Sequence, residues 1–141
     1  MAARTPGSLR CPRRAGGDTS RSRGSAAIPP ALIDVMCVVV FCAVGRRSHA
    51  EGLTVAGLAE TAWPFLAGAA VGWLLSRGWR APTSLTPTGL VVWVCTVAVG
   101  MLLRKVSSQG VAVSFVIVAA LVTALLLLGW RLIWRLAAQL R

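Results

Sequence analysis

Four runs of apolar residues follow a polar first segment and set the plan of the chain. The runs lie at about residues 31–48, 53–75, 88–104 and 111–134. A helix rises about 1.5 Å per residue, so the second run would reach about 34 Å, against a bilayer core of about 30 Å. The first and third runs are shorter. The pattern predicts an all-α integral membrane four-helix bundle over residues 29–141, preceded by a separate tail.

Asp34 and His49 fall on one face of the first predicted helix. At 100° per residue the face spans about 80° of arc. It consists of Asp34, Val38, Phe41, Gly45 and His49. The dipole of a helix favours an acid in its first turn, which would account for Asp34 without any partner. The alternative is that Asp34 begins a polar face that His49 completes.

The second run contains a carboxylate and a proline at helical spacing. A proline lacks an N–H and crowds the carbonyl four residues earlier, so Pro64 would free the backbone acceptor of Glu60. An ionisable residue at membrane depth is expected to face protein or water. Gly68 lies on the same side and Gly72 just beyond it, and the two match a GxxxG pattern, which permits close approach of helices. We expect this side to pack into the bundle, and the two glycines also to permit self-association.

Small and polar residues also share one face of the third predicted helix. They are Gly89, Trp93, Thr96, Gly100 and Arg104. The fourth run is the most hydrophobic and has no charged residue before Arg131. We interpret it as a plain membrane anchor.

The distribution of positive charge predicts the orientation. Eleven of the fifteen Lys and Arg residues fall in the first segment, the middle loop and the C-terminal end, and four fall in the other two turns. Cytoplasmic segments carry an excess of Lys and Arg, so both termini are predicted to be cytoplasmic, in a multi-pass protein of the cell (inner or plasma) membrane. This topology places several residues at the inner side, namely Asp34, Arg77, Trp79, Arg80, Trp130, Arg131 and Trp134.

Residues 1–28 are rich in Arg, Gly, Ser and Pro and show no apolar periodicity, which predicts a disordered basic tail. The net charge of +11 could indicate nucleic acid, but four apolar runs serve no purpose in such a protein, so we expect no nucleic-acid partner. A basic start with a short apolar run also resembles a cleaved secretory signal. Arg46 and Arg47 stand before the cleavage-like residues 48–50 and argue against cleavage. The expected partners are the lipid bilayer and, further, a second copy or another membrane protein.

The candidate chemistry lies at the predicted outer side. There Glu60 would lie about 10 Å below the surface, on the same side as Arg46, His49 and Arg104. We expect a Glu60–Arg104 ion pair, with Arg46 as the alternative partner. Such a pair would either order the bundle or make Glu60 a protonatable site on a path for protons or a small solute.

Catalysis finds little support in the sequence. It contains no Ser/His/Asp set and no phosphate-binding glycine loop after a strand. Its four cysteines show no metal-ligand spacing. We therefore expect no enzymatic activity, no metal and no cofactor.

The same runs carry a family resemblance. The stretches IDVMCVVVFCAVGRRSHAEG, TAWPFLAGAAVGWLL, GLVVWVCTVAVGMLLRK and SFVIVAALVTALLLLGWR resemble small actinobacterial membrane proteins grouped as a domain of unknown function, the one numbered three thousand and fifty-four. The resemblance covers residues 33–131. Its most specific pieces are Asp34, the turn Gly45-Arg46 to His49, Trp63-Pro64 and Arg104. It implies four membrane helices and no established activity.

Taken together, these patterns favour an integral membrane bundle with a structural or partner-binding role. The alternative is a small proton- or solute-coupled carrier that uses Glu60 with Arg104 or His49.

Overall fold

The computed structural model describes residues 28–48 and 52–140, and these ranges are helical apart from short connections. The helices are α1 (Ile28–Ser48), α2 (Val55–Leu75), α3 (Leu90–Val106) and α4 (Val113–Gln139). A short helical turn, η1 (Leu85–Gly89), leads into α3. The all-α, four-helix expectation is confirmed for this part of the chain. The predicted tail, apart from residue 28, lies outside the described residues.

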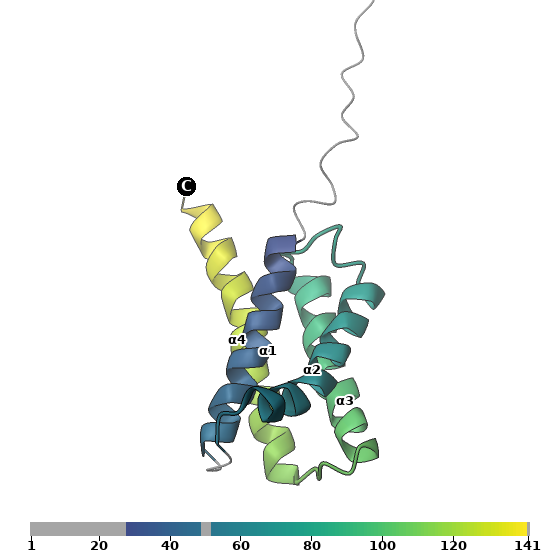
Figure 1. Ribbon diagram of the computed structural model, residues 1–141. Helices are drawn as coiled ribbons and strands as arrows, with labels where there is room; N and C mark the ends of the chain where they lie inside the picture. Colours follow the sequence, from purple (N-terminus) through teal and green to yellow (C-terminus); the bar gives the residue numbers. More distant parts are fainter. Residues whose placement is uncertain (1–27, 49–51, 141) are drawn as a thin grey trace, which may run out of the picture.

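The helices are arranged so that both described ends of the chain lie together (Figure 1). The start of α1, the end of α4 and the α2–α3 connection lie at one end of the bundle, which we call the terminal end. The end of α1 and the α3–α4 turn lie at the opposite end, which we call the turn end. Within the described residues, α1 therefore begins at the same end of the bundle at which α4 ends.

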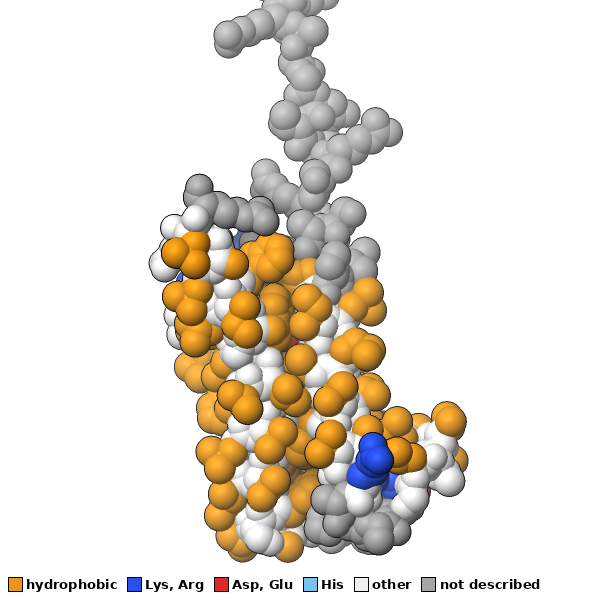
Figure 2. Space-filling model, turned by 90° about the vertical axis from the view of Figure 1, so that its left-hand side faces the viewer, with side chains coloured by type: hydrophobic (Ala, Val, Ile, Leu, Met, Phe, Trp, Pro, Cys, Tyr) orange, Lys and Arg blue, Asp and Glu red, His pale blue; other side chains and the backbone are white. Residues whose placement is uncertain are grey.

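The outer surface is compatible with a membrane. Three helical segments are long and apolar enough to cross one, Val55–Leu75, Leu85–Val106 and Val113–Gln139. Figure 2 shows apolar side chains covering one side of the bundle along its length. On α4, Leu121 and Leu125 are 66% and 74% exposed. A soluble monomer rarely exposes an apolar surface of such extent, so the surface suits a lipid environment.

Three phenylalanines from three helices form the centre of the core. The rings of Phe41 and Phe65 meet edge to face, with centroids 5.3 Å apart. Phe115 lies 6.4 Å from each of them. Such offset arrangements bring the positive edge of one ring to the negative face of another. The aromatic cluster therefore ties α1, α2 and α4 together in the half of the bundle nearer the turn end.

The glycines of α2 allow α3 to approach closely. A Cβ on Gly68 would lie 2.6 Å from the carbonyl oxygen of Cys95, and one on Gly72 would lie 2.6 Å from the Cα of Val92. Real Cβ atoms do not approach other atoms so closely, so only glycine fits at these positions. The predicted packing role of this face is confirmed. The predicted self-association through it is wrong, because α3 of the same chain occupies it.

Helix α2 changes direction along its length. Its first half runs across the bundle at the turn end and its second half runs along the bundle axis (Figure 1). The cause is Pro64, the proline inside this helix, which removes a hydrogen bond from the ladder. The freed carbonyl of Glu60 instead accepts a hydrogen bond from Gln109 Nε2, 3.3 Å away. The α3–α4 turn thus supplies the donor that the proline withholds.

The bend overturns the predicted depth of Glu60. A straight helix would have carried Glu60 about 10 Å below the surface at 1.5 Å per residue. Because the first half of α2 runs across the bundle, its residues gain little depth, and the Glu60 side chain is exposed.

Candidate functional site

A buried ion pair joins the first and last helices at the terminal end. Arg131 Nη1 donates to Asp34 Oδ1 at 2.7 Å, and Arg131 Nη2 donates to Asp34 Oδ2 at 2.6 Å. The Asp34 side chain is 1% exposed and the Arg131 side chain is 0% exposed. This two-point geometry matches the planar fork of a guanidinium to the two oxygens of a carboxylate, and such charge-assisted bonds are the strong ones.

Two tryptophans complete the hydrogen bonding of the Asp34 carboxylate. Trp73 Nε1 on α2 donates to Oδ2, and Trp130 Nε1 on α4 donates to Oδ1, each at 2.9 Å. Each carboxylate oxygen therefore accepts two hydrogen bonds. We call Asp34, Trp73, Trp130 and Arg131 the Asp34 cluster.

The guanidinium of Arg131 is held from further sides. Its Nη1 also donates to the carbonyl oxygen of Leu127, 2.8 Å away, and its Cζ lies 4.5 Å from the centre of the Trp130 ring. A Cβ on Gly89, at the entry to α3, would lie 2.9 Å from Arg131 Cδ. The cluster therefore bonds α1, α2 and α4 together and reaches the start of α3. Arg131 Nε has no hydrogen-bond partner, but all four hydrogen bonds to the carboxylate are made. The pair therefore acts as a structural latch, because each partner offsets part of the cost of burying the other.

The cluster corrects two expectations about its own members. Asp34 is not a first-turn acid, because α1 begins at Ile28 and its first turn contains no acidic residue. Nor is α4 a plain anchor, since Arg131 faces the interior and Trp130 donates to Asp34. Trp79, in the α2–α3 connection, and Trp134, in the last part of α4, are exposed at the terminal end, where the charge distribution placed them together with Asp34 and Arg131. Trp73 was not predicted as a partner, and only its apolar surroundings and indole N–H could have suggested one.

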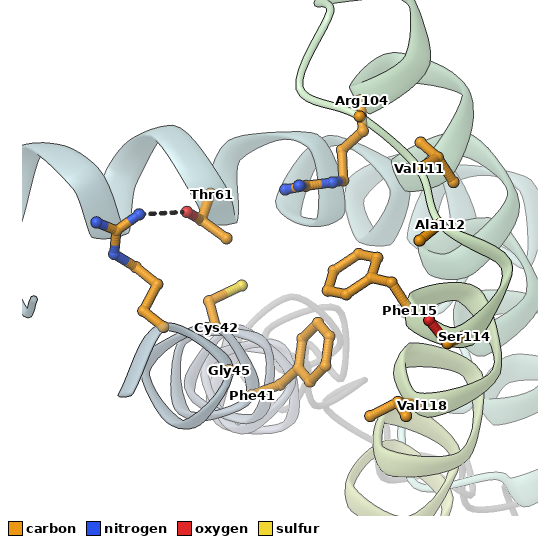
Figure 3. A pocket seen from close by; sticks show the side chains of 12 residues that line it. Phe41, Cys42, Gly45, Thr61, Arg104, Val111, Ala112, Ser114, Phe115 and Val118 are labelled. Atoms are coloured by element: carbon orange, nitrogen blue, oxygen red, sulfur yellow. Dashed lines mark hydrogen bonds between the residues drawn. The ribbon is translucent and has the colours of Figure 1, made fainter. Parts of the chain in front are cut away.

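A second feature, at the turn end, is a cavity of about 590 Å³. It lies between the end of α1, the first half of α2, the α3–α4 turn and the start of α4 (Figure 3). Two of its lining residues are arginines, Arg46 from α1 and Arg104 from α3. Among the described residues, its lining contains no Asp or Glu. We call this space the turn-end cavity.

The two arginines are held differently. Arg46 donates from Nη1 to Thr61 Oγ1 at 3.1 Å and from Nε to the carbonyl oxygen of Gly52 at 3.3 Å. Arg104 lies with its Cζ 4.8 Å from the centre of the Phe115 ring and donates from Nη2 to the carbonyl oxygen of Gln109 at 3.4 Å. Figure 3 shows Arg104 directed toward Phe115 above the space between α1 and α4.

The expected Glu60–Arg104 ion pair is wrong, and so is its alternative with Arg46. Within residues 28–48 and 52–140, the ion pair that forms is Asp34–Arg131. The Glu60 side chain is turned outward, and the residue contacts the α3–α4 turn through its backbone carbonyl. The structure does bring Arg46 and Arg104 to one cavity, as their shared predicted side implied. His49 lies outside the described residues.

The Asp34 cluster and the turn-end cavity both lie in a region of the chain that matches a known family. The family model described as a protein of unknown function, DUF3054, matches residues 31–134. This chain belongs to the DUF3054 family. The match includes the Asp34 cluster and both arginines of the turn-end cavity, so the DUF3054 region holds the two features described above. No curated protein and no solved structure matches the chain.

Proposed function

We propose that this DUF3054 chain is a multi-pass integral membrane protein whose role is to bind a ligand or partner, without catalysis. The observation that carries the proposal is the contrast between the two ends of the bundle. At the terminal end the Asp34 cluster leaves no carboxylate oxygen without hydrogen bonds. At the turn end a cavity of about 590 Å³ is lined by two guanidinium groups. One end of the bundle is held together by the Asp34 cluster, and the other end contains a preformed cavity between helices. Cavities between the helices of a bundle are common ligand-binding sites.

The proposed topology has four crossings with both termini in the cytoplasm of a cell-membrane protein. It is supported by the shared position of the two described chain ends (Figure 1). The connection at the same end contains Arg77 and Arg80, both exposed, as cytoplasmic segments favour. At the turn end, the transverse half of α2 exposes Trp63 and Glu60, an aromatic and a charged side chain that suit a membrane–water interface.

Labelling of single cysteines tests this topology. We would replace the four native cysteines and introduce Ser108→Cys in the α3–α4 turn or Thr83→Cys in the α2–α3 connection. A membrane-impermeant maleimide applied to intact cells should label position 108, and should label position 83 only after the membrane is permeabilised. The reverse pattern would show that the orientation is wrong, and labelling of both positions in intact cells would show that the chain does not span as proposed.

A flux measurement tests the binding role against the carrier alternative. The two described acids argue for binding, because Asp34 is fixed by four hydrogen bonds and Glu60 is exposed outside the bundle interior. In liposomes that enclose a pH-sensitive dye, the wild type and Glu60→Gln should therefore show the same proton flux as protein-free vesicles. A flux present in the wild type and lost in Glu60→Gln would replace the binding role with a carrier.

A further inference from the structure

The turn-end cavity has the size of a ligand site and two kinds of wall. Its volume of about 590 Å³ lies within the range of about 300–1,000 Å³ typical of small-molecule sites. One part of the wall carries the guanidinium groups of Arg46 and Arg104. The other part is apolar and includes Phe41, Phe115 and Val118. A ligand that matches both parts of the wall would have an anionic group and an apolar group.

On the charged wall, Arg104 has hydrogen-bond donors to spare. A guanidinium carries five N–H donors. Arg104 Nε is buried and has no hydrogen-bond partner, and the bond from Nη2 to Gln109 is long at 3.4 Å. Arg131, at the other end of the bundle, likewise has an unpartnered Nε, but it differs from Arg104 because its two Nη atoms donate to two carboxylate oxygens. The chain thus supplies Arg131 with a counter-anion and supplies none to Arg104 within the described residues.

The second arginine is positioned by the protein itself. The bonds from Arg46 to Thr61 Oγ1 and to the carbonyl oxygen of Gly52 fix its guanidinium on the cavity wall. Figure 3 shows Thr61 and its dashed hydrogen bond across the cavity from Arg104 and Phe115. An anion that enters the cavity would lie beside Arg104 from α3 and Arg46 from α1.

The apolar wall continues to the outer surface of the bundle. Val118 lines the cavity, yet it is 53% exposed on α4. The cavity therefore opens at a helix surface that would face acyl chains in the proposed membrane arrangement. A hydrocarbon chain could lie against Phe115 and Val118 and extend into the bilayer without crossing water.

We infer that the turn-end cavity binds an anionic amphiphile, with phosphate or carboxylate oxygens at Arg104 and Arg46 and an apolar chain along Phe115 and Val118. The inference rests on the proposed function, because it names the class of ligand that the bundle binds. The same chemistry is offered by an anionic phospholipid of the bilayer and by a free fatty acid, and the test separates the two.

Native mass spectrometry of the full chain in zwitterionic micelles measures the binding directly. The probes are phosphatidylglycerol, dodecanoate, phosphatidylcholine and inorganic phosphate. Phosphatidylglycerol or dodecanoate should bind at least about ten-fold more tightly than phosphatidylcholine, because charge-assisted hydrogen bonds form only with the anionic heads. Preference for the first probe identifies a bilayer lipid and preference for the second identifies a free acid. Equal binding of phosphatidylcholine, or binding of phosphate as tight as that of both amphiphiles, would overturn the inference.

Matched variants locate the site. Arg104→Gln should weaken binding of the anionic amphiphile by about ten-fold or more. Lys105→Gln removes the same charge from the next residue of α3, which is exposed and does not line the cavity, and should leave binding unchanged. Val118→Trp keeps both arginines but obstructs the apolar wall, so it should weaken binding of the amphiphile even if Arg104→Gln does not fold. Equal effects of Arg104→Gln and Lys105→Gln would show that the binding is non-specific.

The binding test and the cysteine labelling distinguish a wrong cavity assignment from a wrong membrane topology. If the cysteine labels give the expected topology and no amphiphile binds the folded chain, the cavity assignment is wrong and the membrane bundle stands. If the labels contradict the topology, the membrane arrangement on which both proposals depend is wrong.

Discussion

Replacing Asp34 by asparagine should destabilise the bundle severely, although the two side chains have almost the same shape. An amide has one acceptor oxygen and one NH₂ group in place of two acceptor oxygens. Whichever way the amide is turned, its NH₂ group meets one Arg131 Nη and one tryptophan Nε1, all of them donors. Asp34→Asn therefore loses two of the four hydrogen bonds and leaves the charge of Arg131 buried without a counter-charge.

The magnitude follows from these losses. A hydrogen bond between membrane helices contributes about 0.6 kcal/mol on average and at most about 1.7 kcal/mol, so the two lost bonds alone account for about 1–3 kcal/mol. The unpaired charge raises the total, since removing one partner of a buried pair costs about 3–5 kcal/mol. Domains have stabilities of about 5–15 kcal/mol, so the loss is a large fraction of the whole.

Unfolding by sodium dodecyl sulfate in mixed micelles, followed by far-UV circular dichroism, measures this cost. The matched control is Glu60→Gln, which makes the same chemical change at an exposed carboxylate and should alter the free energy of unfolding by no more than about 0.5 kcal/mol. Equal unfolding midpoints for Asp34→Asn and Glu60→Gln would refute the reasoning. A double variant, Asp34→Asn with Arg131→Met, should be more stable than Asp34→Asn alone, because it removes the uncompensated charge.

The same unfolding measurement checks two further expectations. Gly68→Val should cost at least about 1–3 kcal/mol by forcing α3 away, whereas Gly129→Ala, with no atom within 4 Å of the added Cβ, should cost nothing; equal losses would show that the α2–α3 contact is not tight. Trp73→Phe keeps a large ring but removes one hydrogen bond to Asp34, and should cost between about 0.6 and 1.7 kcal/mol. The exposed Trp134→Phe serves as its control and should be neutral, so an equal effect of both would remove Trp73 from the cluster.

The sequence predicted the helices and the packed face of α1 well. Asp34, Val38 and Phe41 are buried together, as the helical plot required. The plot succeeds because α1 contains no proline after its first turn, so the rotation of 100° per residue holds along the buried face. The glycine face of α2 was also predicted, because GxxxG lies wholly after the bend.

The failures have two physical origins, the bend inside α2 and the points at which the helices end. The plot of α2 was extended through Pro64, where the helix changes direction, so Glu60 was assigned to an interior that its half of the helix does not enter. For Asp34 the sequence offered three cations at the correct end. Arg77 and Arg80 follow the end of α2 and are exposed. Only Arg131 lies inside a helix, since α4 continues to Gln139.

The Asp34–Arg131 pair also has a consequence for biosynthesis, because its members are separated by 97 positions. A ribosome delivers α1 well before α4. In the proposed membrane arrangement, Asp34 would lie in or near the bilayer without its partner until Arg131 is synthesised. Inserting a carboxylate at the centre of a membrane helix costs about 2.5–3.5 kcal/mol. Only α4 brings the counter-charge. A truncated chain would therefore keep an unpaired acid that quality-control proteases could recognise, and the completed chain would hide it.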